Sequence, residues 1–511
     1  MKKTTSAGKV YLIGAGPGDP GLLTLRGAEC LARADAVLYD YLANPAILKY
    51  ANPDAELICL GKHGSSRVWT QDEVNQRMVK LAGQGRVVAR LKGGDPAVFA
   101  RGAEEAEILS NARIPFEIVP GITAALAASS CAGIPITHRD CASAVALVTG
   151  QEGPGKIDPS LDFDALAKFP GTLVFYMGVT TVEHWTTALI RAGKNADTPA
   201  AIIRRCSAPD QLTIRCTLGT VRDRMADQPK LRPPAIVIIG DVVTLADTLS
   251  WFDKRPLFGQ TVLVTRPAHQ SESLVAPFTE LGAEVLVQPA IEISPPRDLT
   301  VVDDVLDRLS EFHWLVFSSA NGVHFFLKRL FETDRDCRAL GACKLAAIGP
   351  GTTDALREYH LQSDVQPAEY RAEALAATLK DPARGQRVLL IRASRGREVL
   401  AEELRAGGAD VEQVVVYAST DVAAADAQIA ARLAKGEIDW VTVSSSAIAK
   451  SLHRLFGKDL RQAKLASISP VTSATLRQLG LPPAVEATEY TMDGIVAAVL
   501  ADHSPSVVLW S

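Results

Sequence analysis

Short apolar runs rich in β-branched residues recur along the whole chain, separated by turns and by stretches with helical spacing. Such runs are typical of buried strands, and their alternation with helices predicts an α/β protein. In the first half the predicted strands are residues 10–13, 36–39, 57–60, 88–91, 116–119, 145–148, 172–176, 200–203 and 235–239. In the second half they are residues 261–264, 285–287, 314–317, 344–348, 388–391, 414–417 and 440–443. The regular alternation in this second half predicts parallel sheets.

The helices between these strands have their own signals. Residues 22–34 predict a helix between the first two strands, and residues 121–125 open one made almost wholly of small residues. Small side chains allow close packing, either of a neighbouring helix or of a flat ligand. Thr70 and Glu73 have the spacing of a capping box, so a helix is predicted to begin there and to end near Gly83.

Two glycine-rich turns follow strands of the first half. The strand at residues 88–91 leads into Gly93, Gly94 and Asp95. Two glycines can adopt positive φ and let a ligand approach the backbone closely. Asp95 adds an acceptor at the carboxyl end of the strand, where open α/β sheets bind ligands. The alternative is a tight strand-to-helix turn with nothing bound.

The other turn, at residues 14–21, contains Gly16, Gly18 and Gly21 in the spacing G-x-G-x-x-G, with Asp40 about 20 residues further on. This is the dinucleotide-binding pattern. However, the turn also contains two prolines, which lack the N–H groups that such a loop directs at a pyrophosphate. A proline-stiffened turn instead favours a ligand without phosphates, such as S-adenosylmethionine.

Composition narrows the class of protein further. The 511 residues are enough for three or four domain-sized units, and the net charge of −4 argues against bulk nucleic-acid binding. No apolar stretch approaches the roughly 20 residues that span a membrane, and residues 10–13 are too short for a signal-peptide core. The eight cysteines are scattered without a C-x-x-C. We therefore expect a cytoplasmic protein with reduced thiols and no metal site.

A set of motifs in the first half occurs in a fixed order, at residues 14–20, 23–27, 38–40, 61–62, 90–99, 119–124, 133–139 and 176–178. Together these motifs resemble uroporphyrinogen-III C-methyltransferase over residues 8–250. The resemblance implies a two-lobed tetrapyrrole-methyltransferase fold, with lobes at about 8–143 and 144–250. It also implies S-adenosylmethionine in the cleft, two methylations of uroporphyrinogen III to precorrin-2, and a homodimer formed through this half.

The same resemblance implies the site residues. The contacts to S-adenosylmethionine would be Pro17, Gly93, Gly94, Asp95, Val98, Thr123, Ala124, Met177 and Cys206. Asp40 would act as the catalytic base and Lys62 as its acidic or charge-balancing partner, although the two could equally form an ordinary ion pair at strand ends. The sequence departs from the family at Cys206, where glycine is expected, and at Tyr41, where arginine is usual.

After a linker at residues 251–258, the second half has polar small-residue loops at the carboxyl ends of its strands. The motifs at residues 264–267, 317–323, 347–352 and 414–417 are similar to uroporphyrinogen-III synthase. The similarity covers residues 259–511 and implies two flavodoxin-like domains, one formed by residues 259–291 and 421–511 and the other by 292–420. The implied reaction closes hydroxymethylbilane with inversion of its last pyrrole and loss of water, and needs no cofactor.

By this similarity Tyr417 would be catalytic and would guide departure of the hydroxyl group. The substrate-binding residues would be Ser319, Thr352, Arg392, Arg395 and Ser444. Simpler interpretations remain for each: a buried tyrosine bonded to backbone, hydroxyls that cap the following helices, and a solvated basic loop.

The two resemblances together predict a bifunctional enzyme of tetrapyrrole biosynthesis with small-molecule substrates and neither nucleic acid nor membrane as a partner. One alternative keeps the first fold but changes the acceptor to another corrinoid, and makes the second half a tetrapyrrole-binding module without turnover. In either case we expect the turns at residues 14–21 and 93–96 to frame one cavity.

Overall fold

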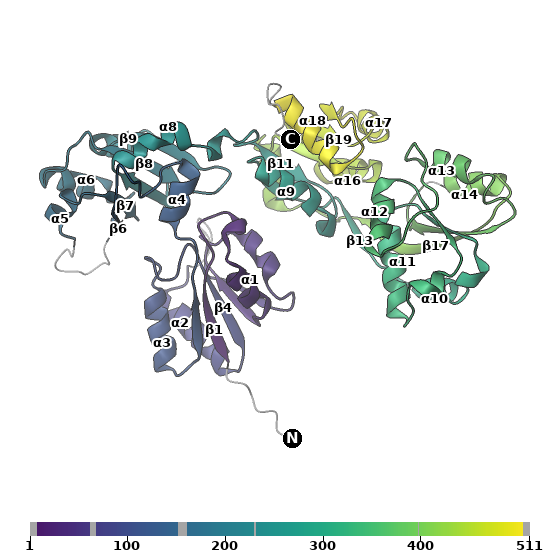
Figure 1. Cartoon of the computed structure of the whole chain (residues 1–511), viewed down its shortest axis with the longest axis horizontal. Coiled ribbons are helices and arrows are strands. Elements are labelled where there is room, and N and C mark those ends of the chain that lie inside the picture. The colour runs from purple at the N-terminus through teal and green to yellow at the C-terminus, as the bar shows by residue number, and fades with distance from the viewer. Residues whose placement is uncertain (1–7, 62–67, 152–160, 229–230, 397, 504–511) are drawn as a thin grey trace, which may run out of the picture. The chain divides into compact units, whose positions relative to one another are not determined.

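The computed structural model describes residues 8–61, 68–151, 161–228, 231–396 and 398–503 (Figure 1). The chain divides into two compact units. Of the described residues, the first contains those up to Gln260 together with Phe278–Glu284, and the second contains Thr261–Pro277 and residues 285–503. Each half of the chain builds two five-stranded sheets.

The first sheet is parallel throughout. Its strand order is β3 (Glu56–Cys59), β2 (Ala36–Tyr39), β4 (Val87–Lys92), β1 (Lys9–Gly14) and β5 (Phe116–Val119). Helix α1 (Leu25–Ala32) packs on one face, and α2 (Gln71–Gly83) and α3 (Gly102–Asn111) pack on the other (Figure 1). The inner strands β1, β2 and β4 are buried because helices cover both faces of the sheet.

The second sheet is mixed. Its order is β6 (Val145–Thr149), β7 (Thr172–Tyr176), β10 (Ala235–Ile239), β8 (Pro199–Arg204) and β9 (Leu212–Thr217). Strands β6 and β7 are parallel, whereas β10 runs antiparallel to both of its neighbours. The surrounding helices are α4 (Ala124–Ala132), α5 (Phe163–Ala167), α6 (Val182–Arg191), α7 (Val221–Ala226) and α8 (Ala246–Leu249).

Helix α4 follows the last strand of the first sheet but packs on the second one. Its alanines share a core with β7, β8 and β10. The small side chains of α4 were predicted to permit close packing. Several of them are buried against the second sheet. The crossing brings the end of β5 next to the second lobe.

The second half begins with a sheet whose order is β12 (Glu284–Val287), β11 (Thr261–Val264), β18 (Trp440–Val443), β19 (Lys464–Ser467) and β20 (Val485–Glu486). Strands β11, β18, β19 and β20 pair in parallel. The helices around this sheet are α9 (Glu272–Glu280), α15 (Ala427–Ala434), α16 (Ser446–Phe456), α17 (Pro470–Gln478) and α18 (Met492–His503).

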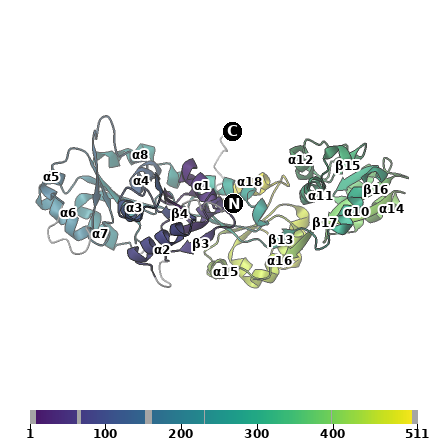
Figure 2. The ribbon, with the colours of Figure 1, turned by 90° about the horizontal axis from the view of Figure 1, so that it is seen from below.

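The last sheet has the order β13 (Ile291–Ser294), β17 (Asp410–Asp421), β16 (Arg387–Ala393), β14 (Trp314–Phe317) and β15 (Lys344–Ala347). Its helices are α10 (Thr300–Asp307), α11 (Ala320–Glu332), α12 (Pro350–Glu358), α13 (Ala372–Leu379) and α14 (Val399–Ala406) (Figure 2). The prediction of parallel sheets is wrong at one pair, because β13 runs antiparallel to the end of β17. These two strands carry the chain between the two sheets of the second half.

The sequence pattern missed β9, β13, β19 and β20. Three of these four, β9, β13 and β20, are edge strands. An edge strand is partly exposed, so its hydrophobic signal is weak. The remaining predicted strands are all present, with ends that differ by a few residues. Within the described part of the chain, no helix combines the length and apolarity that crossing a membrane requires.

The capping box predicted for α2 is confirmed. The Thr70 hydroxyl accepts from the Glu73 N–H at 3.3 Å, and the Glu73 carboxylate accepts from the Thr70 N–H at 2.9 Å. Val74, Met78 and Leu81 then face the first sheet.

Replacing Thr70 by alanine should therefore weaken the start of α2 by about 1 kcal/mol, because one donor of the first turn loses its acceptor. The amides of that turn should exchange with deuterium about fivefold faster than in the parent chain. Gln76→Ala, at an exposed position of the same helix, is the control and should leave the rates unchanged. Equal exchange in Thr70→Ala and the parent would contradict a stabilising cap.

Candidate functional site

The two glycine-rich turns of the first half meet. The Gly94 N–H donates to the Gly16 carbonyl at 2.8 Å, and the Gly16 N–H donates to the Gly94 carbonyl at 3.1 Å. Both glycines have φ of +72°, a conformation that other residues rarely adopt. Strands β1 and β4 are neighbours in the sheet, so their carboxyl ends deliver both turns to one edge. The expectation that these turns lie together is confirmed.

A third segment closes against them. Asp95 accepts from the Gly121 N–H at 2.8 Å and from the Ala97 N–H at 2.7 Å. A Cβ on Gly121 would lie 2.3 Å from the Gly94 carbonyl oxygen and 2.6 Å from the Gly14 Cα. Only glycine fits at this point. The Asp95 carboxylate therefore locks the turn after β5 onto the double-glycine turn.

The second lobe reaches the same place through Tyr176, at the end of β7. Its hydroxyl lies 2.7 Å from the Thr123 hydroxyl and accepts from the Ala125 N–H at 3.0 Å. Burial raises the pKa of Tyr176. Phe99 packs on the ring with centroids 5.0 Å apart. Met177 follows with φ of +52° and is half-exposed.

The loop after β8 forms the remaining wall. Cys206 is buried, and its Sγ lies 3.7 Å from the Ala124 carbonyl oxygen. Val98 and Ala124 pack on the same apolar cluster. The Asp19 N–H donates to the Ser207 hydroxyl at 3.1 Å, which joins the proline-stiffened turn, with Pro17, to this loop. The structure thus brings the nine predicted adenosyl-contact residues into one connected region.

Backbone strain marks this region as well. Eight non-glycine residues of the described chain have positive φ, and five of them border this region: Phe99, Arg101, Met177, Arg205 and Ser207. Each such conformation costs of order 1–3 kcal/mol and is typical of ligand sites. Residue type alone offered no signal for these positions.

Asp40 stands at the end of β2. One carboxylate oxygen accepts from the N–H groups of Leu42 and Ala43, at 3.0 and 3.3 Å. The other lies 3.5 Å from an Arg90 nitrogen, and the side chain is 26% exposed. A Cβ on Gly93 would lie 2.5 Å from the Leu42 Cβ, so the Asp40 turn packs directly against the double-glycine turn. Lys62 lies outside the described residues, and the pairing of Asp40 with Lys62 stays a prediction.

In the second half, Tyr417 on β17 is buried and contacts Ser319. Their hydroxyl oxygens are 3.0 Å apart, and Ser319 also accepts from the Gly322 N–H at the start of α11. The Tyr417 ring stacks on Phe325 with centroids 5.6 Å apart. Burial raises the pKa of Tyr417, while hydrogen bonds with Ser319 and Asn321 oppose the rise. The predicted tyrosine is therefore bonded to side chains rather than to backbone.

The other predicted substrate residues are placed differently. Thr352 is buried in the first turn of α12, and Ser444 is partly exposed after β18. Arg392 pairs with Glu398, and Arg395 pairs with Asp421. The basic loop is therefore not simply solvated, since both guanidinium groups have carboxylate partners.

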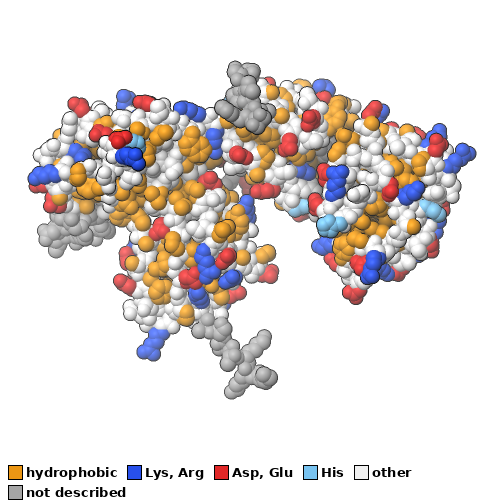
Figure 3. Space-filling model, in the orientation of Figure 1, with side chains coloured by type: hydrophobic (Ala, Val, Ile, Leu, Met, Phe, Trp, Pro, Cys, Tyr) orange, Lys and Arg blue, Asp and Glu red, His pale blue; other side chains and the backbone are white. Residues whose placement is uncertain are grey.

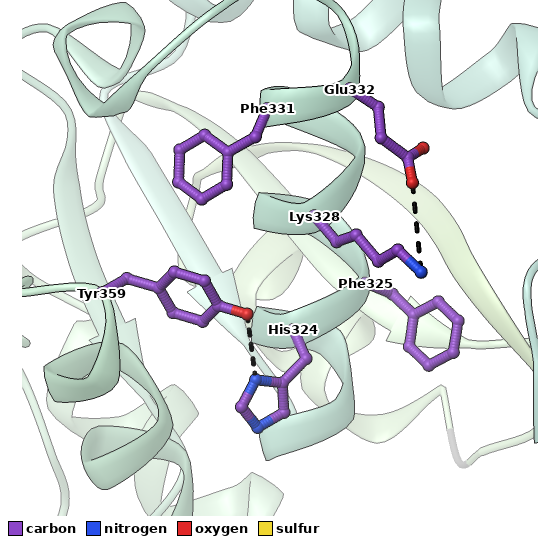
Figure 4. Close-up of a pocket in the computed structure, with 6 residues that line it drawn as sticks. All are labelled: His324, Phe325, Lys328, Phe331, Glu332 and Tyr359. Carbon is purple, nitrogen blue, oxygen red and sulfur yellow. Dashed lines mark hydrogen bonds and ion pairs between the residues drawn. The ribbon is translucent and has the colours of Figure 1, made fainter. Parts of the chain in front are cut away.

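A pocket of about 440 Å³ opens on α11 (Figure 4). Its lining residues are His324, Phe325, Lys328, Phe331, Glu332 and Tyr359. Figure 3 shows hydrophobic side chains exposed on the surface over α11, and Phe331 is among the exposed residues. Because Phe325 also stacks on Tyr417, the pocket and the tyrosine share one wall.

The two halves of the chain match two families of tetrapyrrole-processing proteins. The family described as Tetrapyrrole (Corrin/Porphyrin) Methylases matches residues 9–222, and the family described as Uroporphyrinogen-III synthase matches residues 272–497. The chain belongs to the family in which a tetrapyrrole methylase is fused to a uroporphyrinogen-III synthase.

Three relatives illustrate the match. The porphyrin biosynthesis protein HemD of Ruminiclostridium josui is 34% identical over 96% of this chain and 95% of its own length. The uroporphyrinogen-III C-methyltransferase of Bacillus subtilis is 37% identical over 70% of this chain and 74% of its own. The S-adenosyl-L-methionine-dependent uroporphyrinogen III methyltransferase of Methanosarcina barkeri is 47% identical over 47% of this chain and 94% of its own.

Burial also predicts how Cys206 reacts. It raises the pKa of the Cys206 thiol to about 12, so at pH 8 only about 10⁻⁴ of the thiol is thiolate, the form that reacts with iodoacetamide. We expect Cys206 to be alkylated much more slowly than the partly exposed Cys337, as measured by peptide mass spectrometry. Denaturant should abolish the difference. Comparable rates in the native chain would contradict a buried thiol.

Proposed function

We propose that the second half closes hydroxymethylbilane to uroporphyrinogen III and that the first half methylates this product twice, giving precorrin-2. The observation that carries the methylation is the backbone pairing of Gly16 with Gly94, locked by Asp95 on Gly121. This pairing and the segments packed on it form a cradle of backbone and, apart from Asp95, uncharged side chains next to the Asp40 carboxylate. The cradle comprises the nine predicted adenosyl-contact residues. Membership of the fused family and the activities for which the relatives are named support the choice of substrates.

The cradle suits S-adenosylmethionine. At Gly94 a Cβ would meet nothing closer than 3.9 Å, so the backbone there presents an open surface. The residues that would hold the cofactor are Pro17, Gly93, Gly94, Asp95, Val98, Thr123, Ala124, Met177 and Cys206. A methyl group on a sulfonium is already activated, and the main task of the protein is to align it with the nucleophilic pyrrole carbon.

Asp40 is the proposed proton acceptor. Attack by a pyrrole carbon on the methyl group leaves a cation, and loss of a proton from this cation restores a neutral ring system. Such a proton is acidic, so an ionised carboxylate is a sufficient base. Asp40 is partly exposed beside Gly93, with one oxygen free of backbone hydrogen bonds. The competing role for Asp40 is a purely structural ion pair with Arg90.

For the second half, Tyr417 and Ser319 are the proposed centre. Hydroxymethylbilane loses its hydroxyl group to form a reactive azafulvene, and a phenol can donate a hydrogen bond to the departing oxygen. The surrounding loops would hold the flexible chain in the conformation that closes with inversion and would exclude the uninverted closure. No cofactor is needed for these steps.

A second candidate function is a methyltransferase of another corrinoid, joined to a tetrapyrrole-binding module without turnover. One observation favours it. Arg392 and Arg395 already have carboxylate partners, so they are less able to fix a flexible bilane in the conformation that closes with inversion. Supplying the full-length protein with hydroxymethylbilane alone separates the candidates. Faster-than-spontaneous formation of the type III isomer supports the synthase, and tight binding with only the type I product supports the module.

The fusion itself suggests a further advantage, because the product of the second half is the substrate of the first. Tethering two sites raises the local concentration of the intermediate. With hydroxymethylbilane and S-adenosylmethionine supplied, the fused parent chain should release less uroporphyrinogen than an equimolar mixture of Asp40→Asn and Tyr417→Phe chains. In that mixture each variant supplies the activity that the other lacks. Equal release would remove this advantage.

With hydroxymethylbilane and S-adenosylmethionine, the parent protein should form a doubly methylated tetrapyrrole, identified by mass. Asp40→Asn should bind S-adenosylmethionine normally but lower kcat for methylation at least about 100-fold, because the amide cannot accept the proton. Asp72→Asn, at an exposed position of α2, is the control. Activity of Asp40→Asn within a few-fold of the parent would leave Asp40 with the structural role only.

Tyr417→Phe should lower the rate of type III cyclisation by about 10- to 100-fold, because the phenyl ring keeps the stacking on Phe325 but loses the donor. The methylation of added uroporphyrinogen III should stay unchanged in the same variant. Tyr50→Phe provides a matched control in the first half. Isomer analysis by chromatography measures the outcome, and a parental cyclisation rate in Tyr417→Phe would exclude the proposed donor.

A further inference from the structure

Strand β4 carries two buried cations beneath the proposed methylation site. Arg90 and Lys92 are two residues apart, so they project from the same face of the sheet, toward α2 and α3. Their side chains are only 7% and 3% exposed. The strand lies in the middle of the first sheet, where an apolar residue would be the ordinary occupant.

A single carboxylate joins these cations. Glu105 on α3 is completely buried, and its Oε1 accepts from Lys92 at 2.7 Å, from Gln71 at 2.9 Å and from Arg90 Nε at 3.4 Å. Its Oε2 is buried and has no hydrogen-bond partner among the described residues. Arg90 Nη1 also donates to the Leu91 carbonyl at 2.9 Å. The guanidinium is therefore held at two points, and its Nη2 faces Asp40.

This arrangement of buried charges is an unfavourable way to stabilise the fold. Buried ion pairs commonly lose more by desolvation than they gain by attraction, and apolar residues of similar volume often serve as well. Two cations face one fully enclosed carboxylate, which leaves an excess positive charge. Asp40, at 3.5 Å from Arg90 Nη2, is the remaining carboxylate that the described contacts place against the cluster. Asp40 is the partly exposed member of the cluster, so the excess positive charge acts on the proposed methylation site.

We propose that Arg90 is a positioning residue for Asp40, that Glu105 holds Arg90 in place, and that the buried guanidinium keeps the Asp40 carboxylate oriented during methylation. The inference rests on the proposed role of Asp40 as proton acceptor. It adds that the acceptor is controlled from inside the sheet, by residues that do not touch the substrate.

The charged and titratable groups around Asp40 come from several elements. Strand β4 contributes Arg90 and Lys92, and α3 contributes Glu105. Burial lowers the pKa of Lys92, and Arg90 adds to this effect while Glu105 opposes it. The adjacent Tyr41 has a raised pKa through burial and the nearby Asp40 charge. From α2 the cluster receives only the neutral side chains of Gln71 and Asn75.

The test compares kcat for methylation with KM for S-adenosylmethionine. Arg90→Gln loses the contact with Asp40, so kcat should fall about 10-fold. Glu105→Gln releases the Arg90 guanidinium and should lower kcat by a similar factor. KM for S-adenosylmethionine should change less than twofold in both, because neither residue borders the cradle. Arg33→Gln, at an exposed position, is the control.

Arg90→Lys covers the case in which Arg90→Gln does not fold, as judged by thermal unfolding. Lysine keeps the charge but has no fork to reach Asp40, Glu105 and Leu91 together, so kcat should fall about 10-fold. A parental kcat in Arg90→Lys or in folded Arg90→Gln overturns the inference. If Asp40→Asn is itself active, the proposed role of Asp40 fails instead, which distinguishes the two outcomes.

Discussion

The pairing of two glycine backbones, Gly16 with Gly94, is the contact on which the first site depends. A side chain at Gly121 would separate these turns, since a Cβ there would overlap the Gly94 carbonyl oxygen. The turn that holds Thr123 therefore reaches its place only because three glycines meet without Cβ atoms. Thr123 in turn contacts Tyr176 of the second lobe. Close backbone packing thus determines where both lobes present their residues.

Charge is distributed very unevenly around this contact. The surfaces of the cradle consist of backbone and uncharged side chains, apart from Asp95, whose oxygens are occupied by backbone N–H groups. The charges of Arg90, Lys92 and Glu105 are buried between the first sheet and helices α2 and α3. In a low-dielectric interior such charges act on one another strongly. Asp40 is the partly exposed carboxylate on which these buried charges act.

The second half builds its site by a different route. Its two sheets are joined by β13 and β17, and the last residues of β17 pair with β13. Gln270 of one lobe donates to Asn321 of the other, near Ser319 and Tyr417. This contact joins the segment after β11 to the first turn of α11. The arginines of the basic loop pair with carboxylates instead of standing free, which residue type could not reveal.

The sequence by itself determined most of the strands, the capping box of α2, both glycine-rich turns and the resemblance to two enzyme families, because these depend on local periodicity, turn chemistry and ordered motifs. It failed at edge strands such as β9 and β13, whose signal is weak, and at the antiparallel course of β13. Only the tertiary structure decided that Arg90 faces Asp40, that Glu105 holds two cations, and that Phe99 and Ser207 adopt positive φ. Those features arise from contacts between strands and helices far apart in the chain, and no local pattern encodes them.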